Sequence, residues 1–141
     1  MKQIILVSDH GGFELKEKIK AHLMQHGIKV QDTSATDVDY PILAKRGVEL
    51  VKHHDTQGIF LCGSGVGICI AANRYKGIRA ALVHSQIYAQ LARQHNDANI
   101  LCLGGRFLEP DEALKIVEIF LQTPFVGERH SRRVELIDTL S

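Results

Sequence analysis

Short apolar runs alternate with longer amphipathic segments along the chain, and this alternation limits its possible folds more than any other feature. The runs with the length and apolar content of buried β-strands are residues 3–8, 28–31, 58–62, 78–83 and 99–103. The segments with helical spacing or helix-end signals are residues 13–26, 40–54, 66–75, 85–94, 110–122 and 129–140. Such alternation predicts a parallel sheet with right-handed crossovers, in a three-layer α/β/α sandwich.

The composition is that of an ordinary globular domain. A length of 141 residues suits one domain, 1–141, with one core. The 17 basic residues nearly balance the 16 acidic ones, which argues against a nucleic-acid-binding protein, and no apolar run approaches the roughly 20 residues of a membrane span. The three cysteines are odd in number and lie in apolar surroundings, as reduced thiols of the cytoplasm do. We therefore expect a cytoplasmic protein with no nucleic-acid or membrane partner, and no CxxC or HExxH pair suggests a metal site.

A glycine-rich turn, CGSGVG, joins the third predicted strand to the next helix. In open parallel sheets ligands bind beyond the carboxyl ends of the strands, and glycines there can present backbone N–H groups to an anion. The turn lacks the lysine of a P-loop and the third glycine of a dinucleotide fingerprint. A thiol near a helix N-terminus readily acts as a base or nucleophile, so we favour chemistry over inert packing for Cys62 and expect Cys69 and Cys102 to be core residues.

Polar side chains follow two further predicted strands. Asp9 and His10 come directly after the first strand, and Arg106 comes after the glycine pair that ends the fifth. Asp9 could orient a base, accept a hydroxyl proton or cap the next helix, and His10 could bind phosphate or act as an acid. We expect the three glycine-bearing strand ends to converge in space.

A histidine and several arginines in the C-terminal half are further candidates. His95 and Asn96 precede the fifth predicted strand, and we expect them near the same strand ends, where an imidazole could transfer protons. A helix C-terminus alone also favours a histidine. Arg129 and Arg133 share a helix face and suit a phosphate, although a solvated basic flank is the alternative. Arg132 is also close to Arg129, so spacing alone does not choose between Arg132 and Arg133.

Five blocks of sequence, taken together, resemble a known family. They are SDHGGFELK, DYP, CGSGVGICIAANR, RQHNDANILCLGGR and RHSRRVELI, in this order. The chain resembles the ribose-5-phosphate isomerase B and galactose-6-phosphate isomerase family. This resemblance implies a Rossmann-like sandwich with five parallel strands in the order 2-1-3-5-4, and a reaction without metal or cofactor. It also implies a homodimer or dimer of dimers with shared active sites, in which the last helix, about 129–140, reaches a partner subunit.

The resemblance also implies roles for matching positions. Cys62 would carry the proton between C2 and C1 of the open-chain sugar phosphate, with Ser64 assisting proton traffic between O1 and O2. Asp9 and His95 would open the sugar ring. The enediolate would be held by backbone amides of Gly63, Ser64, Gly65 and Gly67. The sugar hydroxyls would be held by Tyr40 and Asn96, and the phosphate by His10, Arg106, Arg129 and Arg133, a pattern that selects Arg133 over Arg132.

These roles predict an aldose–ketose isomerase acting on ribose 5-phosphate and ribulose 5-phosphate in the pentose phosphate pathway. Galactose-6-phosphate isomerase, built from two related chains, and allose-6-phosphate isomerase are the alternatives within the family. A non-catalytic sugar-phosphate sensor would keep the arginines and glycines but would not need both Cys62 and His95. A thiol redox protein is disfavoured because no resolving cysteine lies near Cys62 in the sequence.

Overall fold

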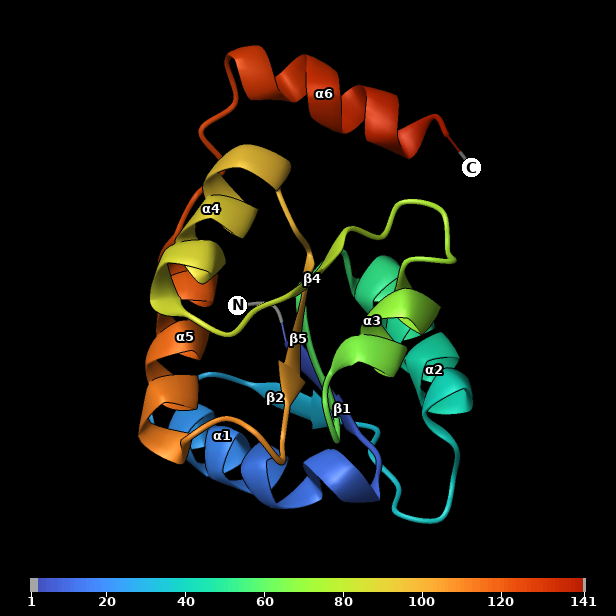
Figure 1. Ribbon diagram of the computed structural model, residues 1–141, viewed down its shortest axis with the longest axis vertical. Helices are drawn as coiled ribbons and strands as arrows, with labels where there is room; N and C mark the ends of the chain where they lie inside the picture. Colours follow the sequence, from blue (N-terminus) through green and yellow to red (C-terminus); the bar gives the residue numbers. More distant parts are fainter. Residues whose placement is uncertain (1–2, 141) are drawn as a thin grey trace.

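A five-stranded parallel sheet forms the centre of the molecule (Figure 1). The computed structural model describes residues 3–140, so Met1, Lys2 and Ser141 of the predicted domain lie outside the described residues. The strands are β1 (Ile4–Ser8), β2 (Val30–Asp32), β3 (Gly58–Cys62), β4 (Ala80–Leu82) and β5 (Ile100–Gly104). They are all parallel, in the order β2-β1-β3-β5-β4. The expected strand number, direction and order are therefore confirmed.

Helices cover both faces of the sheet (Figure 1). The layer on one face consists of α1 (Phe13–Gln25), α4 (Gln86–Asn96) and α5 (Pro110–Gln122). The layer on the other face consists of α2 (Tyr40–His54) and α3 (Val66–Ala72). A 3-10 turn, η1 (His10–Gly12), precedes α1, and the last helix is α6 (Arg129–Asp138). No helix within residues 3–140 has both the length and the apolar character needed to cross a membrane.

The core has two halves, one on each side of the sheet. In β1, Leu6 packs into the half beneath α1, α4 and α5, whereas Val7 packs into the half beneath α2 and α3. Because helices bury both faces, β1, β3 and β5 are buried along their length and apolar except for Ser8 at the end of β1, instead of alternating with polar residues. This burial explains why short continuous apolar runs marked these strands in the sequence.

Most predicted boundaries agree with the structure, and the largest difference is at α3. The helix ends at Ala72 rather than at residue 75. The Asn73 side chain accepts a hydrogen bond from the Ala80 N–H over 2.8 Å and donates one to the Ala80 carbonyl over 2.9 Å. These bonds replace continued helix and lead the chain into β4. The edge strands β2 and β4 have only three residues each, shorter than predicted.

The two ends of the parallel sheet have different surroundings (Figure 1). The strands finish at what we term the carboxyl end, beside the start of α1 and the loop between β2 and α2. They begin at the amino end, which α6 crosses outside both helical layers. The two ends therefore bring different parts of the sequence together.

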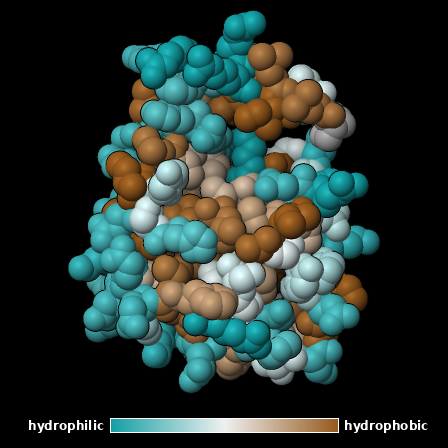
Figure 2. Space-filling view, viewed as in Figure 1, coloured by the Kyte–Doolittle hydropathy of each residue, from teal (hydrophilic) through white to brown (hydrophobic). Residues whose placement is uncertain are grey.

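Helix α6 and the residues that follow it leave apolar side chains on the surface. Leu136, Ile137 and Leu140 are all exposed. Figure 2 shows apolar side chains gathered at this end of the molecule and across the middle of the same face. A cavity of about 440 Å³ has Ile78, Ala80, Ile137 and Leu140 among the residues that line it. An apolar surface of this kind commonly marks an interaction site.

Candidate active site

The backbone segments that follow β1, β3 and β5 touch one another at the carboxyl end. The Gly105 N–H donates to the Cys62 carbonyl over 2.9 Å, and the Arg106 N–H donates to the Gly63 carbonyl over 3.0 Å. A Cβ atom placed on Gly11 would lie 2.9 Å from the Gly63 nitrogen, which leaves no room for a larger residue. The predicted convergence of these three strand ends is confirmed.

Asp9 is held in place by the turn that follows it. Its Oδ1 accepts hydrogen bonds from the N–H groups of Gly11, over 2.9 Å, and Gly12, over 3.3 Å. The capping role that the sequence offered as an alternative is therefore observed. The carboxylate is nearly buried, whereas the neighbouring His10 is exposed. Capping fixes the position of Asp9 without excluding a second function for its carboxylate.

Tyr40 begins α2 and lies against the glycine turn. A Cβ atom on Gly67 would lie 2.5 Å from Cζ of Tyr40 and 2.7 Å from its hydroxyl oxygen. Gly65 has a left-handed φ of +80°, and a Cβ atom there would meet the backbone carbon of Leu103 at 2.8 Å. The turn therefore needs glycine so that a side chain and a neighbouring strand can approach its backbone closely.

Asp9, Tyr40 and the first glycine of the turn, Gly63, border a cavity of about 310 Å³. The Arg106 guanidinium lies beside the turn, because a Cβ atom on Gly63 would be 3.1 Å from its Nη1. An exposed guanidinium next to glycine backbone is well suited to a phosphate. The cavity is lined by Asp9, His10, Gly11, Val38, Asp39, Tyr40, Gly63 and Arg106.

The three thiols differ in position. Cys62 ends β3 one residue before Gly63 of the cavity, and only 5% of its surface is exposed. Burial raises the pKa of the Cys102 thiol well above its ordinary value, as expected for a core residue. Cys69 is half-buried on α3 rather than part of the core, with its Sγ 3.6 Å from the Ala80 carbonyl. Cys62 is therefore the thiol next to the cavity wall in sequence, and its side chain packs in the core half beneath α2 and α3.

Ser64 lies on the exposed side of the glycine turn. Its Oγ accepts a hydrogen bond from the Val66 N–H over 3.2 Å, at the start of α3. The hydroxyl thus supports the turn directly after Gly63, in a position open to solvent.

The expectation that His95 and Asn96 lie near the strand ends that carry Cys62 is wrong for a single chain. Helices between parallel strands run opposite to the strands, so the C-terminus of α4 lies at the amino end, where β5 begins. There the His95 ring stacks on the ring of His130 from α6, with centroids 4.1 Å apart and planes 11° apart. His95 and Asn96 are therefore grouped with α6 and not with the cavity.

Positive groups of α6 gather beside His95. Arg129 and Arg133 are exposed, whereas His130 is buried against His95 of α4. Burial lowers the pKa of His130, and electrostatic interaction with His95, Arg129 and Arg133 lowers it further. His95, Asn96, Arg129, His130 and Arg133 are termed the amino-end cluster below.

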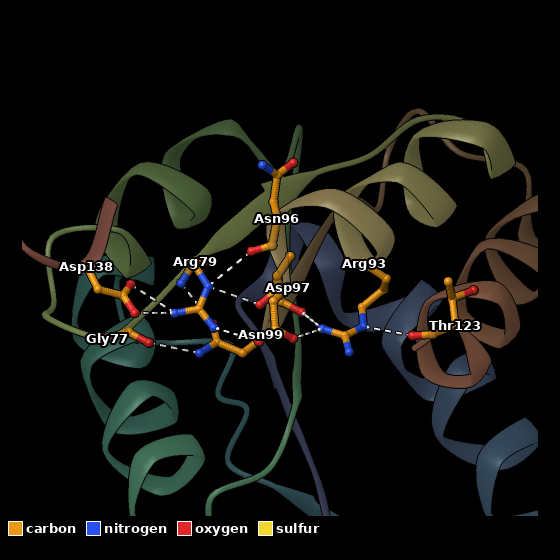
Figure 3. A network of polar contacts seen from close by, with 9 residues as sticks. Gly77, Arg79, Arg93, Asn96, Asp97, Asn99, Thr123 and Asp138 are labelled. Atoms are coloured by element: carbon orange, nitrogen blue, oxygen red, sulfur yellow. Dashed lines mark hydrogen bonds and ion pairs between the residues drawn. The ribbon is translucent and has the colours of Figure 1, made fainter. Parts of the chain in front are cut away.

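A network of arginines and aspartates holds this part of the molecule (Figure 3). Arg79 Nη1 donates to both carboxylate oxygens of Asp138, over 2.9 and 3.0 Å, and so fixes the end of α6. Its Nε donates to the carbonyls of Asn96 and Asp97, each over 3.1 Å. Arg93 Nη1 donates to Asp97 Oδ1 over 2.8 Å. The two arginines thus hold the turn after α4, where Asp97 has a left-handed φ of 46°.

The comparisons with known proteins agree with one another. The family model described as Ribose/Galactose Isomerase matches residues 4–137. A crystal structure of a ribose 5-phosphate isomerase from Thermotoga maritima is 50% identical, covers 99% of both chains and has a TM-score of 0.94. The structure of ribose-5-phosphate isomerase B from Mycoplasma genitalium with bound ribulose-5-phosphate is 44% identical, covers 96% of this chain and 93% of that chain, and has a TM-score of 0.91. Ribose-5-phosphate isomerase B of Escherichia coli is 42% identical over 144 residues, covering 99% of this chain and 97% of that protein.

Proposed function

The chain belongs to the ribose/galactose isomerase family, and from that premise we propose that it interconverts ribose 5-phosphate and ribulose 5-phosphate. The observation that carries the proposal is similarity over 96% of this chain to a relative whose structure holds ribulose-5-phosphate. The cavity at the carboxyl end supports it, since the side chains of His10 and Arg106 both border it and can both donate hydrogen bonds to an anion. The reaction belongs to the pentose phosphate pathway, and we place it in the cytoplasm.

We assign the base to Cys62. The thiolate would take the proton from C2 of the open-chain aldose and return it to C1 of the enediolate, which gives the ketose. A hydroxyl proton would move between O1 and O2 at the same time, assisted by Ser64. Cys62 suits this role because its neighbour Gly63 lines the cavity. A positioned base of this kind contributes roughly 10²–10⁴-fold to the rate.

The negative charge of the enediolate would be held by backbone amides of Gly63, Ser64, Gly65 and Gly67. Close packing of Gly63 and Gly65 against neighbouring backbone fixes this turn before substrate arrives. Losing one such donor typically costs about 2.7–4 kcal/mol. This set of donors supports catalysis without a metal or other cofactor.

Substrate binding uses the remaining groups of the cavity. His10 and Arg106 would hold the phosphate, and Tyr40 would hold a sugar hydroxyl. Asp9 would take part in ring opening, since capping already fixes its carboxylate at the cavity wall.

We further propose that the amino-end cluster completes the active site of a partner subunit. The two ends of the sheet are one strand length apart, and the five residues of β5 span about 16 Å. His95 at the amino end therefore cannot reach the cavity of its own chain. The exposed apolar side chains of α6 would cover a partner in a homodimer or dimer of dimers. His95 would then open the ring, Asn96 would hold a hydroxyl, and Arg129 and Arg133 would hold the phosphate.

The activity is tested by assaying ribose 5-phosphate beside galactose 6-phosphate and allose 6-phosphate after exhaustive chelation. We expect ribose 5-phosphate to be the preferred substrate and its turnover to be unchanged by chelation. A preference for galactose 6-phosphate would select the alternative within the family. A loss of activity that a divalent ion restores would refute metal-free catalysis, and binding without turnover of any of the three would indicate a sensor.

The shared site is tested by mixing two inactive variants, Cys62→Ala and the double variant Arg129→Ala/Arg133→Ala. A mixed dimer would contain one site with both defects and one with neither. Activity should therefore return after subunit exchange, approaching one intact site for each mixed dimer. If exchange is demonstrated and activity stays absent, the arginines serve their own chain and the shared-site proposal is wrong.

A further inference from the structure

We propose a binding site for a divalent ion of the zinc type between α1 and α5, formed by His22, His26 and Glu118. The isomerase reaction proposed above does not use these residues. Helix α1 begins near the cavity and has 13 residues, so its far end lies about 20 Å away from the reaction. The ion would therefore act on the structure and not on the substrate.

The three side chains already converge. His22 Nε2 lies 2.8 Å from Glu118 Oε1, and the ring centroids of His22 and His26 are 4.3 Å apart. One ligand atom from each residue lies within 4.8 Å of the other two. Metal–ligand bonds of about 2.0–2.2 Å place the ligands of a tetrahedral ion about 3.3 Å apart, so small side-chain rotations suffice. Among residues 3–140, no other three histidine, cysteine or carboxylate side chains meet this closely.

His26 is oriented as a metal ligand would be. Its Nδ1 is 2.7 Å from the His22 carbonyl, which can only accept a hydrogen bond. Nδ1 therefore carries a proton, and in the neutral ring Nε2 keeps the lone pair that binds a metal. Metal-binding histidines almost always donate their other ring N–H to such an acceptor. His26 is the C-cap of α1, four residues after His22, and this position brings its ring beside that of His22.

The surroundings are half enclosed. A cavity of about 80 Å³ is bordered by the three side chains and by Leu23, Ile28 and Leu121. This volume exceeds the roughly 30 Å³ of one water, so an ion could complete its coordination with solvent. His22 is 19% and Glu118 45% exposed, which leaves an entry path.

The donor set selects the kind of ion. Two imidazole nitrogens and one carboxylate suit zinc and its neighbours such as cobalt and nickel. Magnesium and calcium prefer oxygen ligands throughout and would bind poorly here. A bound ion would link α1 to α5, which pack side by side on one face of the sheet. The alternative is an ordinary ion pair between His22 and Glu118.

The test is thermal unfolding and calorimetric titration of the intact chain with zinc chloride. We expect one zinc per chain, and free zinc at 100 times its Kd should raise the folded-to-unfolded ratio about 100-fold. His26→Gln should fold, because this ring is exposed. Losing a residue that only hydrogen-bonds to a metal ligand typically weakens metal binding 10–100-fold, so losing the ligand itself should weaken zinc binding by at least that factor. Glu118→Gln keeps the shape of the side chain and should also weaken binding.

The matched control is His54→Gln, because His54 is another exposed histidine at the end of a helix. It should bind zinc as the unaltered chain does. Cobalt substitution should give a spectrum without thiolate charge-transfer bands. The proposal is overturned if zinc does not stabilise the chain, if His26→Gln and Glu118→Gln bind zinc normally, or if cobalt shows a thiolate band.

Discussion

The two ends of the sheet are held together in different ways. At the carboxyl end, backbone packs directly on backbone, as where Gly65 approaches Leu103 and Gly11 approaches Gly63. At the amino end, charged side chains make the connections, as where Arg79 bridges α4 and α6. The first arrangement depends on residues without a side chain, and the second depends on long side chains.

This difference matches the tasks proposed for the two ends. Backbone packing fixes the direction of N–H groups, which is what a preorganised anion site requires. Ion pairs with partly exposed carboxylates, 35% for Asp97 and 40% for Asp138, hold a helix that has few other contacts with its own domain. We therefore expect substitutions at the carboxyl end to have abrupt effects and substitutions at the amino end to have graded ones.

The largest effect is expected for Cys62→Ala at the carboxyl end. Removing the proposed base should lower turnover of ribose 5-phosphate by roughly 10²–10⁴-fold, while sugar phosphate binding is retained. Steady-state rates and calorimetric binding measure the two quantities. Cys69→Ala is the control, because Cys69 lies on α3 away from the cavity lining and should keep its turnover. Near-normal turnover of Cys62→Ala would remove the thiol from the mechanism.

The next effect compares two glycines with the same backbone conformation. Gly65 and Gly77 have φ of +80° and +83°, but a Cβ atom on Gly77 would meet nothing within 4 Å. Gly77→Ala should therefore cost only the left-handed strain, about 1–2 kcal/mol of unfolding free energy. Gly65→Ala should add overpacking against β5, for a total of roughly 2–5 kcal/mol. Urea unfolding measures both, and equal losses would show that backbone packing at the carboxyl end is not the limiting factor.

The sequence predicted the carboxyl end well because its signals are local. The glycine turn is contiguous with Cys62, and the rule that ligands bind at the carboxyl ends of strands placed Asp9 and Arg106 beside it. The position of His95 was misjudged because proximity to a strand in sequence does not specify which end of that strand. The antiparallel course of a crossover helix would have placed it at the amino end.

The connections of the amino end could not be predicted from sequence, because their partners are far apart along the chain. Arg79 and Asp138 are separated by 59 residues, and His22 and Glu118 by 96. The sequence shows that His22 and His26 are four residues apart. Without Glu118 beside them, however, such a pair looks the same as two solvated histidines. Side-chain networks of this kind depend on tertiary packing, which no local pattern encodes.

A graded effect is expected for Arg79 at the amino end. Arg79→Ala should lower the unfolding free energy by about 1–3 kcal/mol, because it leaves Asp138 and the carbonyl of Asn96 without their donor. Arg79→Lys keeps the charge but not the forked geometry of the guanidinium. Its unfolding free energy should therefore lie between those of the unaltered chain and Arg79→Ala. Amide hydrogen exchange in α6 should rise in the same order. Unchanged exchange in Arg79→Ala would show that α6 is held by its apolar contacts alone.

The carboxyl end also contains a charged network, so backbone packing is not the only interaction that holds this end together. Lys16 on α1 is only 2% exposed and donates to Asp32 at the end of β2 over 2.6 Å. Asp32 Oδ1 accepts from the Ser34 N–H, and Ser34 Oγ accepts from the N–H of Ser8. This chain of contacts ties the loop after β2 to the strand that precedes Asp9.

The smallest effect is expected on acid stability, through Asp32. Partial burial raises its pKa, but hydrogen bonds from Lys16 and Ser34 and the charge of Lys16 outweigh burial and lower the pKa from 3.8 to about 2. A lowered pKa stabilises the folded chain above the unfolded value, and this contribution disappears as the pH falls from about 4 to 2. Each pKa unit corresponds to about 1.36 kcal/mol, and allowing for solvent screening we expect about 1 kcal/mol. Urea unfolding across this pH range should show a loss that is smaller by that amount in Asp32→Asn, which lacks the titrating carboxyl group. The reduction should be partial in Lys16→Met, because Ser34 and Lys20 still contact Asp32. If both variants lose stability as steeply as the unaltered chain, this network does not contribute to acid stability, and the carboxyl end depends on its glycine packing alone.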